Sequence, residues 1–99
     1  MPIFTLTPDS YNALQYNLAR PTLVQFELRA SHPVKSYFMA LPEYQLFLQG
    51  RPFNYTGGYA DARSIQSQTV WLPFAGAWYL VISNPSQHDL VEVNCEVYF

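Results

Sequence analysis

A chain of 99 residues has room for one domain with one hydrophobic core, so we expect a single domain over residues 1–99. Hydrophobic residues make up 49% of the chain and charged residues only 12%, which excludes a disordered chain and indicates a surface that repels other proteins weakly. The net charge is −2 and the five basic residues are spread singly, which argues against nucleic-acid binding, and no apolar run is long enough for membrane insertion.

The first half of the chain is predicted to contain strands and two helical segments. Residues 3–7 are predicted to form a short strand, and residues 9–18 an irregular turn of helix. Residues 23–29 alternate between apolar and polar side chains, the pattern of a half-buried strand, and residues 34–41 are predicted to be another strand. Residues 42–50 begin with proline and end with glycine, which favour the start and the end of a helix. We therefore predict one short helix there.

The second half of the chain is predicted to contain three strands joined by turns. Two of them, residues 65–72 and 77–83, lie on either side of Pro73-Phe74-Ala75-Gly76. The last strand, residues 90–99, has the clearest alternation, and its expected core-facing residues are Val91, Val93, Cys95, Val97 and Phe99. The spacing of the turns favours an all-β fold, an antiparallel β-sandwich of about seven or eight strands with one short helix.

Residues 65–83 are predicted to form a hairpin that is apolar on both faces. In the predicted antiparallel register, Trp71 lies opposite Trp78. A two-layer sandwich buries only one face of each sheet, so something must cover the second face. Either the helix at 42–50 or the N-terminal segment covers it, and the tryptophans are ordinary core residues, or one tryptophan face binds another protein.

The segment from Phe53 to Tyr59 is a candidate binding loop. Gly57 and Gly58 permit a positive φ and a tight turn, which would present Tyr55 and Tyr59 on either side. Loops on a rigid sandwich commonly carry function. The alternative is that both tyrosines plug the end of the sandwich.

Three motifs suggest a relationship to known proteins. They are Tyr55-Thr56-Gly57-Gly58, Leu72-Pro73 and Gly76-Ala77-Trp78-Tyr79-Leu80-Val81. Together they resemble a small bacterial family of domains of unknown function, found alone or fused to TIR signalling domains, over roughly residues 20–98. The pattern is also similar to the wider jelly-roll and GOLD-like sandwiches. The resemblance implies a compact β-sandwich with an accessory role, and it supplies no catalytic residues.

The residue types needed for catalysis or metal binding do not come together in the sequence. His32 and His88 lie in predicted turns, and a zinc site needs three or four ligands at close spacing. Cys95 is expected to be a small core residue, and a single cysteine fits a reducing compartment. Since the N-terminus lacks the pattern of a secretory signal, we expect a cytoplasmic protein. We predict no enzymatic activity, no metal and no cofactor.

Two functional hypotheses follow. The first is a non-catalytic interaction module that binds a protein partner, or a second copy of itself, through an uncharged, aromatic-rich sheet face or loop end. The alternative is a β-sandwich that binds a small ligand or a carbohydrate by stacking it on Tyr55, Tyr59 and Phe74. The candidate binding residues are Trp71, Trp78, Tyr55, Tyr59 and Phe74.

Overall fold

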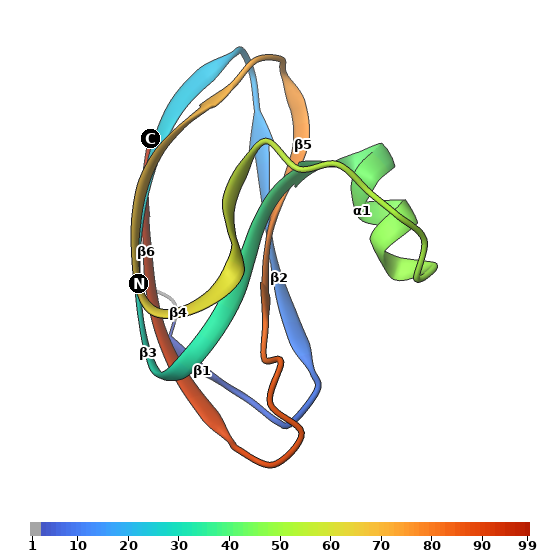
Figure 1. Ribbon diagram of the computed structural model, residues 1–99. Helices are drawn as coiled ribbons and strands as arrows, with labels where there is room; N and C mark the ends of the chain where they lie inside the picture. The colour runs from blue at the N-terminus through green and yellow to red at the C-terminus, as the bar shows by residue number, and fades with distance from the viewer. Residues whose placement is uncertain (1–2) are drawn as a thin grey trace.

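The computed structural model describes residues 3–99 and shows an all-β fold (Figure 1). Within that range the chain forms six strands and one helix. In chain order they are β1 Ile3–Leu6, β2 Tyr11–Leu18, β3 Thr22–Ala40, α1 Leu41–Leu48, β4 Gly57–Leu72, β5 Gly76–Ser83 and β6 Val91–Tyr98. No helix in this part of the chain is long and apolar enough to span a membrane.

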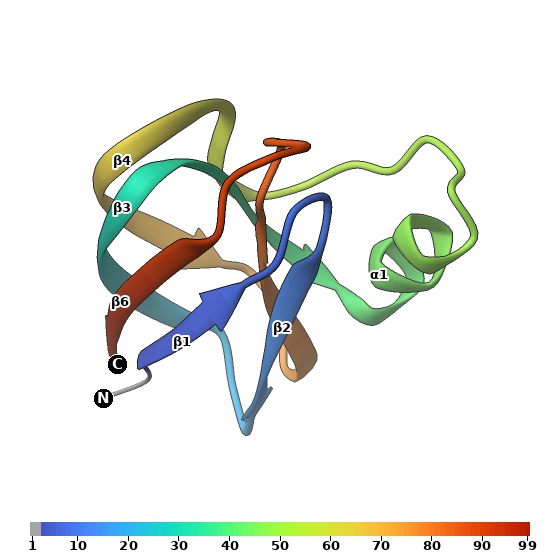
Figure 2. The same cartoon turned by 90° about the horizontal axis from the view of Figure 1, so that it is seen from below.

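The strands form one antiparallel sheet that curls into a half-barrel. Five strands follow the order β1-β6-β3-β5-β2, and β4 lies along β3. Seen from below, β1 and β6 lie on one side of the curl, and β2 and β5 lie on the other (Figure 2). The all-β prediction is confirmed, with six strands over residues 3–99 where seven or eight were expected.

The curl originates in β3, which takes part in both halves of the sheet. Its residues 25–30 pair with β6 and its residues 35–40 pair with β5, while β4 accompanies it on the opposite side. Between Arg29 and Ser36 the register with β4 shifts twice. Such irregularities bend and twist a strand, so β3 passes from one half of the sheet to the other without ending. The two strands predicted before and after His32 are therefore a single bent strand.

A buried polar network supports this bend. The Gln66 side-chain amide donates hydrogen bonds to the carbonyl oxygens of Val34 (2.7 Å) and Arg63 (3.1 Å). Ser36 Oγ donates to Gln66 Oε1 (2.5 Å) and accepts the backbone N–H of Tyr59 (3.1 Å). The network thus pairs the polar groups that the shifted register leaves near the core, as burial requires.

The predicted alternation of buried and exposed residues is confirmed for two strands. On β3, Val24, Phe26 and Leu28 are buried and the residues between them are exposed. On β6, the buried residues are Val91, Val93 and Cys95. Val97 is partly buried and packs against the core, as predicted, whereas the prediction fails at Phe99, which is 61% exposed.

Helix α1 covers the outer face of the β2-β5-β3 part of the sheet. It has Pro42 in its first turn, as predicted, and Tyr44 stacks on Tyr79 of β5 with ring centroids 4.1 Å apart. Met39 and Val81, which share this face, are fully buried. Of the two alternatives for the second apolar face, coverage by the helix is the one found on β5.

The predicted helical turn at 9–18 is wrong, because residues 11–18 form strand β2. Leu14, Tyr16 and Leu18 recur at every second position and pack against the core. Their period of two fits a strand, and pairing along the whole length of β5 holds this segment extended.

The predicted hairpin is also wrong. In the described chain β4 pairs with β3, where Trp71 lies opposite Leu23, whereas β5 pairs with β2 and β3, and Trp78 lies opposite Tyr16. The turn at 73–75 therefore joins different parts of the curled sheet. Because β4 and β5 do not pair with each other, Trp71 and Trp78 are not cross-strand partners. Trp71 is exposed on the outer face, and Trp78 is buried in the core.

Candidate functional site

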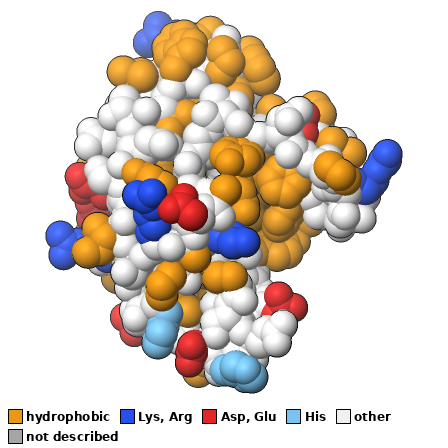
Figure 3. All heavy atoms as spheres, viewed as in Figure 1, with side chains coloured by type: hydrophobic (Ala, Val, Ile, Leu, Met, Phe, Trp, Pro, Cys, Tyr) orange, Lys and Arg blue, Asp and Glu red, His pale blue; other side chains and the backbone are white. Residues whose placement is uncertain are grey.

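Exposed apolar side chains gather at the end of the molecule where the β2–β3 and β4–β5 turns lie (Figures 1 and 3). Trp71 and Leu23 are cross-strand partners there. Gln25, two residues further along β3 on the same face, lies opposite Tyr98 of β6. We call this surface the apolar end. Its members are Leu23 (57% exposed), Trp71 (54%), Phe74 (50%), Tyr98 (48%) and Phe99 (61%).

The buried side chain of Trp78 packs against Phe74 and fixes the position of the β4–β5 turn. This side chain is only 1% exposed, and its Nε1–H donates a hydrogen bond to the carbonyl oxygen of Phe74 (2.9 Å). The rings of the two residues lie 4.8 Å apart between centroids. Trp78 is therefore a core residue that positions the turn, and of the two predicted tryptophans only Trp71 is available to a partner.

Tyr55, Phe74 and Trp78 line one depression of about 290 Å³ between the start of α1, the loop after α1 and the β4–β5 turn. Glu43 Oε2 accepts the backbone N–H of Asn54 (2.8 Å), which ties this loop to the helix. Three of the five predicted binding residues thus meet around one hollow, with a carboxylate at its edge.

Tyr59 does not line this depression. Its hydroxyl donates to the carbonyl oxygen of Ser67 (2.7 Å), and the Arg63 guanidinium lies 4.8 Å above its ring. Gly57 and Gly58 begin strand β4 where a turn was expected, because both pair with β3. The candidate loop therefore ends before Gly57, and Tyr59 is a partly buried strand residue.

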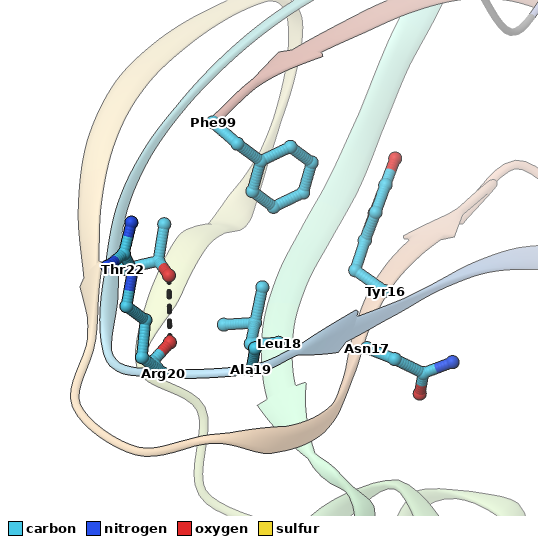
Figure 4. Close-up of a pocket in the computed structure, with 7 residues that line it drawn as sticks. All are labelled: Tyr16, Asn17, Leu18, Ala19, Arg20, Thr22 and Phe99. Atoms are coloured by element: carbon cyan, nitrogen blue, oxygen red, sulfur yellow. Dashed lines mark hydrogen bonds between the residues drawn. The ribbon is translucent and has the colours of Figure 1, made fainter.

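A second depression, of about 450 Å³, opens beside the apolar end between β2, the β2–β3 turn and the end of β6 (Figure 4). Its lining residues are Tyr16, Asn17, Leu18, Ala19, Arg20, Thr22 and Phe99. The rings of Tyr16 and Phe99 lie 5.1 Å apart, and both point into the space between the strands. Phe99 thus belongs both to this depression and to the apolar end.

Comparison with known proteins adds no family to this geometry. No protein-family model and no curated protein matches the chain. The role of the apolar end follows from the chemistry of its own side chains.

The sequence prediction missed Leu23, Tyr98 and Phe99. Leu23 and Gln25 are two residues apart on β3, so their side chains lie on the same, outer face. The alternation of residues 23–29 therefore indicated that Leu23 is exposed. Phe99 was expected in the core because it continues the alternation of β6, but the strand ends at Tyr98 and the core does not extend over it.

Groups that could perform catalysis or bind a metal are dispersed. Within residues 3–99 no three His, Cys, Asp or Glu side chains lie close enough to hold a metal ion. His32 and His88 are both exposed. Asp61 and Arg63 form an exposed ion pair (2.8 Å), whose hydrogen bond lowers the pKa of the Asp61 carboxyl.

Cys95 is expected to be inert to thiol reagents in the folded protein. Burial, and to a lesser extent the charge of Glu96, raises the pKa of its thiol from a usual value of 9.0 to about 11. The thiolate is the reactive form, so at about pH 8 labelling should need unfolding. Since the folded pKa is the higher one, its contribution to stability is present below pH 9.0 and is lost as the pH rises toward 11.

Labelling with a chromogenic disulfide reagent, with and without urea, checks this prediction. Urea titrations across the same alkaline range should show a stability loss that is smaller in Cys95→Ala. Rapid labelling of the native protein would contradict the burial of this side chain.

Proposed function

We propose that this protein is a non-catalytic interaction module that binds a partner protein through the apolar end. The observation that carries the proposal is the pair of Trp71 and Leu23, which lie side by side in regular strands and are both more than half exposed. Contiguous exposed apolar surface on a folded domain is typical of an interaction site.

The members of the apolar end have the properties of binding anchors. Tryptophan and tyrosine are among the residues whose truncation most often costs an interface about 2 kcal/mol or more. Leu23, Trp71 and Tyr98 stand on paired strands, so little backbone freedom is lost when a partner binds. Among its described lining residues, the adjoining depression has one charged side chain, Arg20, so the surface offers little charge repulsion.

We further propose that the curled sheet is a β-sandwich of the jelly-roll or GOLD-like kind, within the small bacterial family that its motifs resemble. The bent strands β3 and β4, which run through both halves of the sheet, support this assignment. The accessory role that the resemblance implies agrees with a binding module. A cytoplasmic location is supported by the free, buried Cys95.

Substitution of Trp71 by serine tests the proposal. Immobilised wild-type protein should capture a partner from an extract of the producing cells, and Trp71→Ser should reduce the captured amount by about tenfold or more, the factor that corresponds to 1.4 kcal/mol. Quantitative mass spectrometry of the captured proteins is the measurement.

Ile65→Ser is the matched control. Ile65 also lies on β4 and is 70% exposed, but it pairs with Arg29, far along the strand from the apolar end. It should capture the same partner as the wild type. Equal capture by all three proteins, or loss only in Ile65→Ser, would contradict the assignment of the apolar end.

A second candidate function is the binding of a small ligand, and the depression lined by Tyr55, Phe74 and Trp78 favours it. Aromatic walls with a nearby carboxylate suit a carbohydrate or another ligand with an apolar face and polar groups. A thermal-shift screen of sugars and metabolites, with Tyr55→Ala as the variant, tests this function. A stabilising ligand should lose its effect in Tyr55→Ala, and the absence of any hit would count against this candidate.

A further inference from the structure

Strand β2 has a free edge. In the described chain β2 pairs with β5 alone. The carbonyl oxygen of Ser10, just before β2, accepts the N–H of Asn84, just after β5 (2.9 Å). In an antiparallel pair, every second residue forms hydrogen bonds with the partner strand, so the even-numbered residues of β2 bond to β5. The N–H and C=O groups of Tyr11, Ala13, Gln15 and Asn17 therefore point away from the sheet.

This edge lacks the features by which edge strands avoid pairing. Natural edges are shortened, bulged, charged or interrupted by proline. The eight residues of β2 contain no charged residue and no proline, and their register with β5 runs without a shift from Tyr11 to Leu18. Eight residues also exceed the usual strand length of about 5–6.

The other edges of the sheet differ from β2 in length or in what they leave uncovered. Strand β1 has only four residues. Strand β4 carries Asp61 and Arg63 in its first half, where its register with β3 shifts twice, whereas its second half, residues 65–72, is uncharged and pairs with β3 without a shift. In that second half the core-facing Val70 and Leu72 are already buried, so a further strand there would cover little apolar surface.

The core-facing side chains of β2 also remain incompletely covered. Leu14, Tyr16 and Leu18 face the core but are only partly buried. The depression of about 450 Å³ lies along two of them, Tyr16 and Leu18. A further strand added at this edge would cover their open side.

We propose that a second copy of this chain pairs with the edge of β2, strand to strand and antiparallel, about a two-fold axis. Self-complementarity selects this occupant, because an antiparallel edge turned about a two-fold axis presents donors to its own acceptors, and two uncharged copies of β2 bring no like charges together. An axis at Leu14 or at Gln15 keeps the core-facing residues of both copies on one side of the continuous sheet. The depression beside β2 adjoins the apolar end at Phe99, but the edge of β2 contains no member of the apolar end, and the proposal does not depend on the function proposed there.

Sedimentation equilibrium of the full chain, with a paired set of lysine variants, tests the proposal. Gln15→Lys places two ammonium groups near the axis and should raise the dimer dissociation constant by about tenfold or more. Gln25→Lys is the matched control, because Gln25 is equally an exposed glutamine on a strand but lies on β3. It should dimerise like the wild type.

Amide hydrogen exchange gives a readout of the edge itself. The amides of Ala13, Gln15 and Asn17 should exchange slowly in concentrated protein and rapidly on dilution, whereas the amide of Leu14, bonded to β5, should be protected at both concentrations. Ala13→Pro removes one edge donor without removing a bond to β5, so it should weaken the dimer while the fold is retained.

The proposal is overturned by a wild type that sediments only as a monomer, by a dimer whose edge amides exchange freely, or by lysine variants that both weaken the dimer to the same extent. Protection of the edge amides by a captured foreign protein, in a chain that stays monomeric alone, would assign the edge to another partner and equally refute the second copy.

Discussion

Replacing Trp78 with alanine is expected to lower the free energy of unfolding by about 4 kcal/mol. The Trp78 side chain is 1% exposed, and its indole packs against Phe74 and donates to the carbonyl oxygen of that residue. The substitution leaves a cavity in the core and an unpaired carbonyl in the β4–β5 turn. In a domain of this size the melting temperature should fall by about 15–30 °C.

Trp71→Ala is the matched variant, with the same change of residue at an exposed position. Since Trp71 is 54% exposed and makes its contacts on the outer face beside Leu23, its loss should cost about 1 kcal/mol or less. Urea unfolding followed by circular dichroism measures both variants. A larger loss for Trp71→Ala than for Trp78→Ala would reverse the assignment of the buried and the exposed tryptophan.

The sequence was informative wherever structure depends on neighbouring residues. The alternation of Val24, Phe26 and Leu28 decides which side of β3 is buried, whatever strand pairs with it. The proline and glycine at the two ends of residues 42–50 limit a helix in the same local way, and α1 forms there. Such signals are contained in a few consecutive residues.

Strand pairing could not be derived in this way, because it depends on residues far apart in the chain. An alternating strand such as β5 can satisfy its hydrogen bonds equally well with β4, its neighbour in sequence, or with β2 and β3. A short turn at 73–75 favours the neighbour. The bend of β3 decides otherwise, because it brings residues 35–40 alongside β5. That bend depends on Gln66, thirty positions away from Ser36 in the chain.

The candidate site shows the same division. The sequence identified Trp71 from the predicted hairpin and Tyr55 from the candidate loop, and the structure places both of them, with Phe74, at exposed positions. The sequence could not separate Trp71 from Trp78, because the exposed face of each strand follows from its partners. Tyr59 was misassigned for a related reason, since the glycines before it serve a close approach of two strands and not a turn.

Gly58→Ala is expected to lower the free energy of unfolding by about 4 kcal/mol or more. Gly58 has a φ of +111°, and a Cβ atom added to it would lie 2.3 Å from the carbonyl oxygen of Ser36 on β3. Its N–H also donates to Gln68 Oε1 (2.6 Å), so the backbone cannot move away without losing this bond. Strain at such a φ costs about 1–3 kcal/mol, and the clash with β3 adds to it.

Gly76→Ala separates the two contributions. Gly76 has a similar φ of +117°, but no atom lies within 4 Å of an added Cβ, so only the strain applies and the loss should be about 2 kcal/mol. Chemical denaturation of the two variants provides the comparison. Equal losses would mean that β3 and β4 do not approach closely at Gly58. A larger loss at Gly58 would show that glycine is required there to join β4 to the bent part of β3, directly after the loop that carries Tyr55.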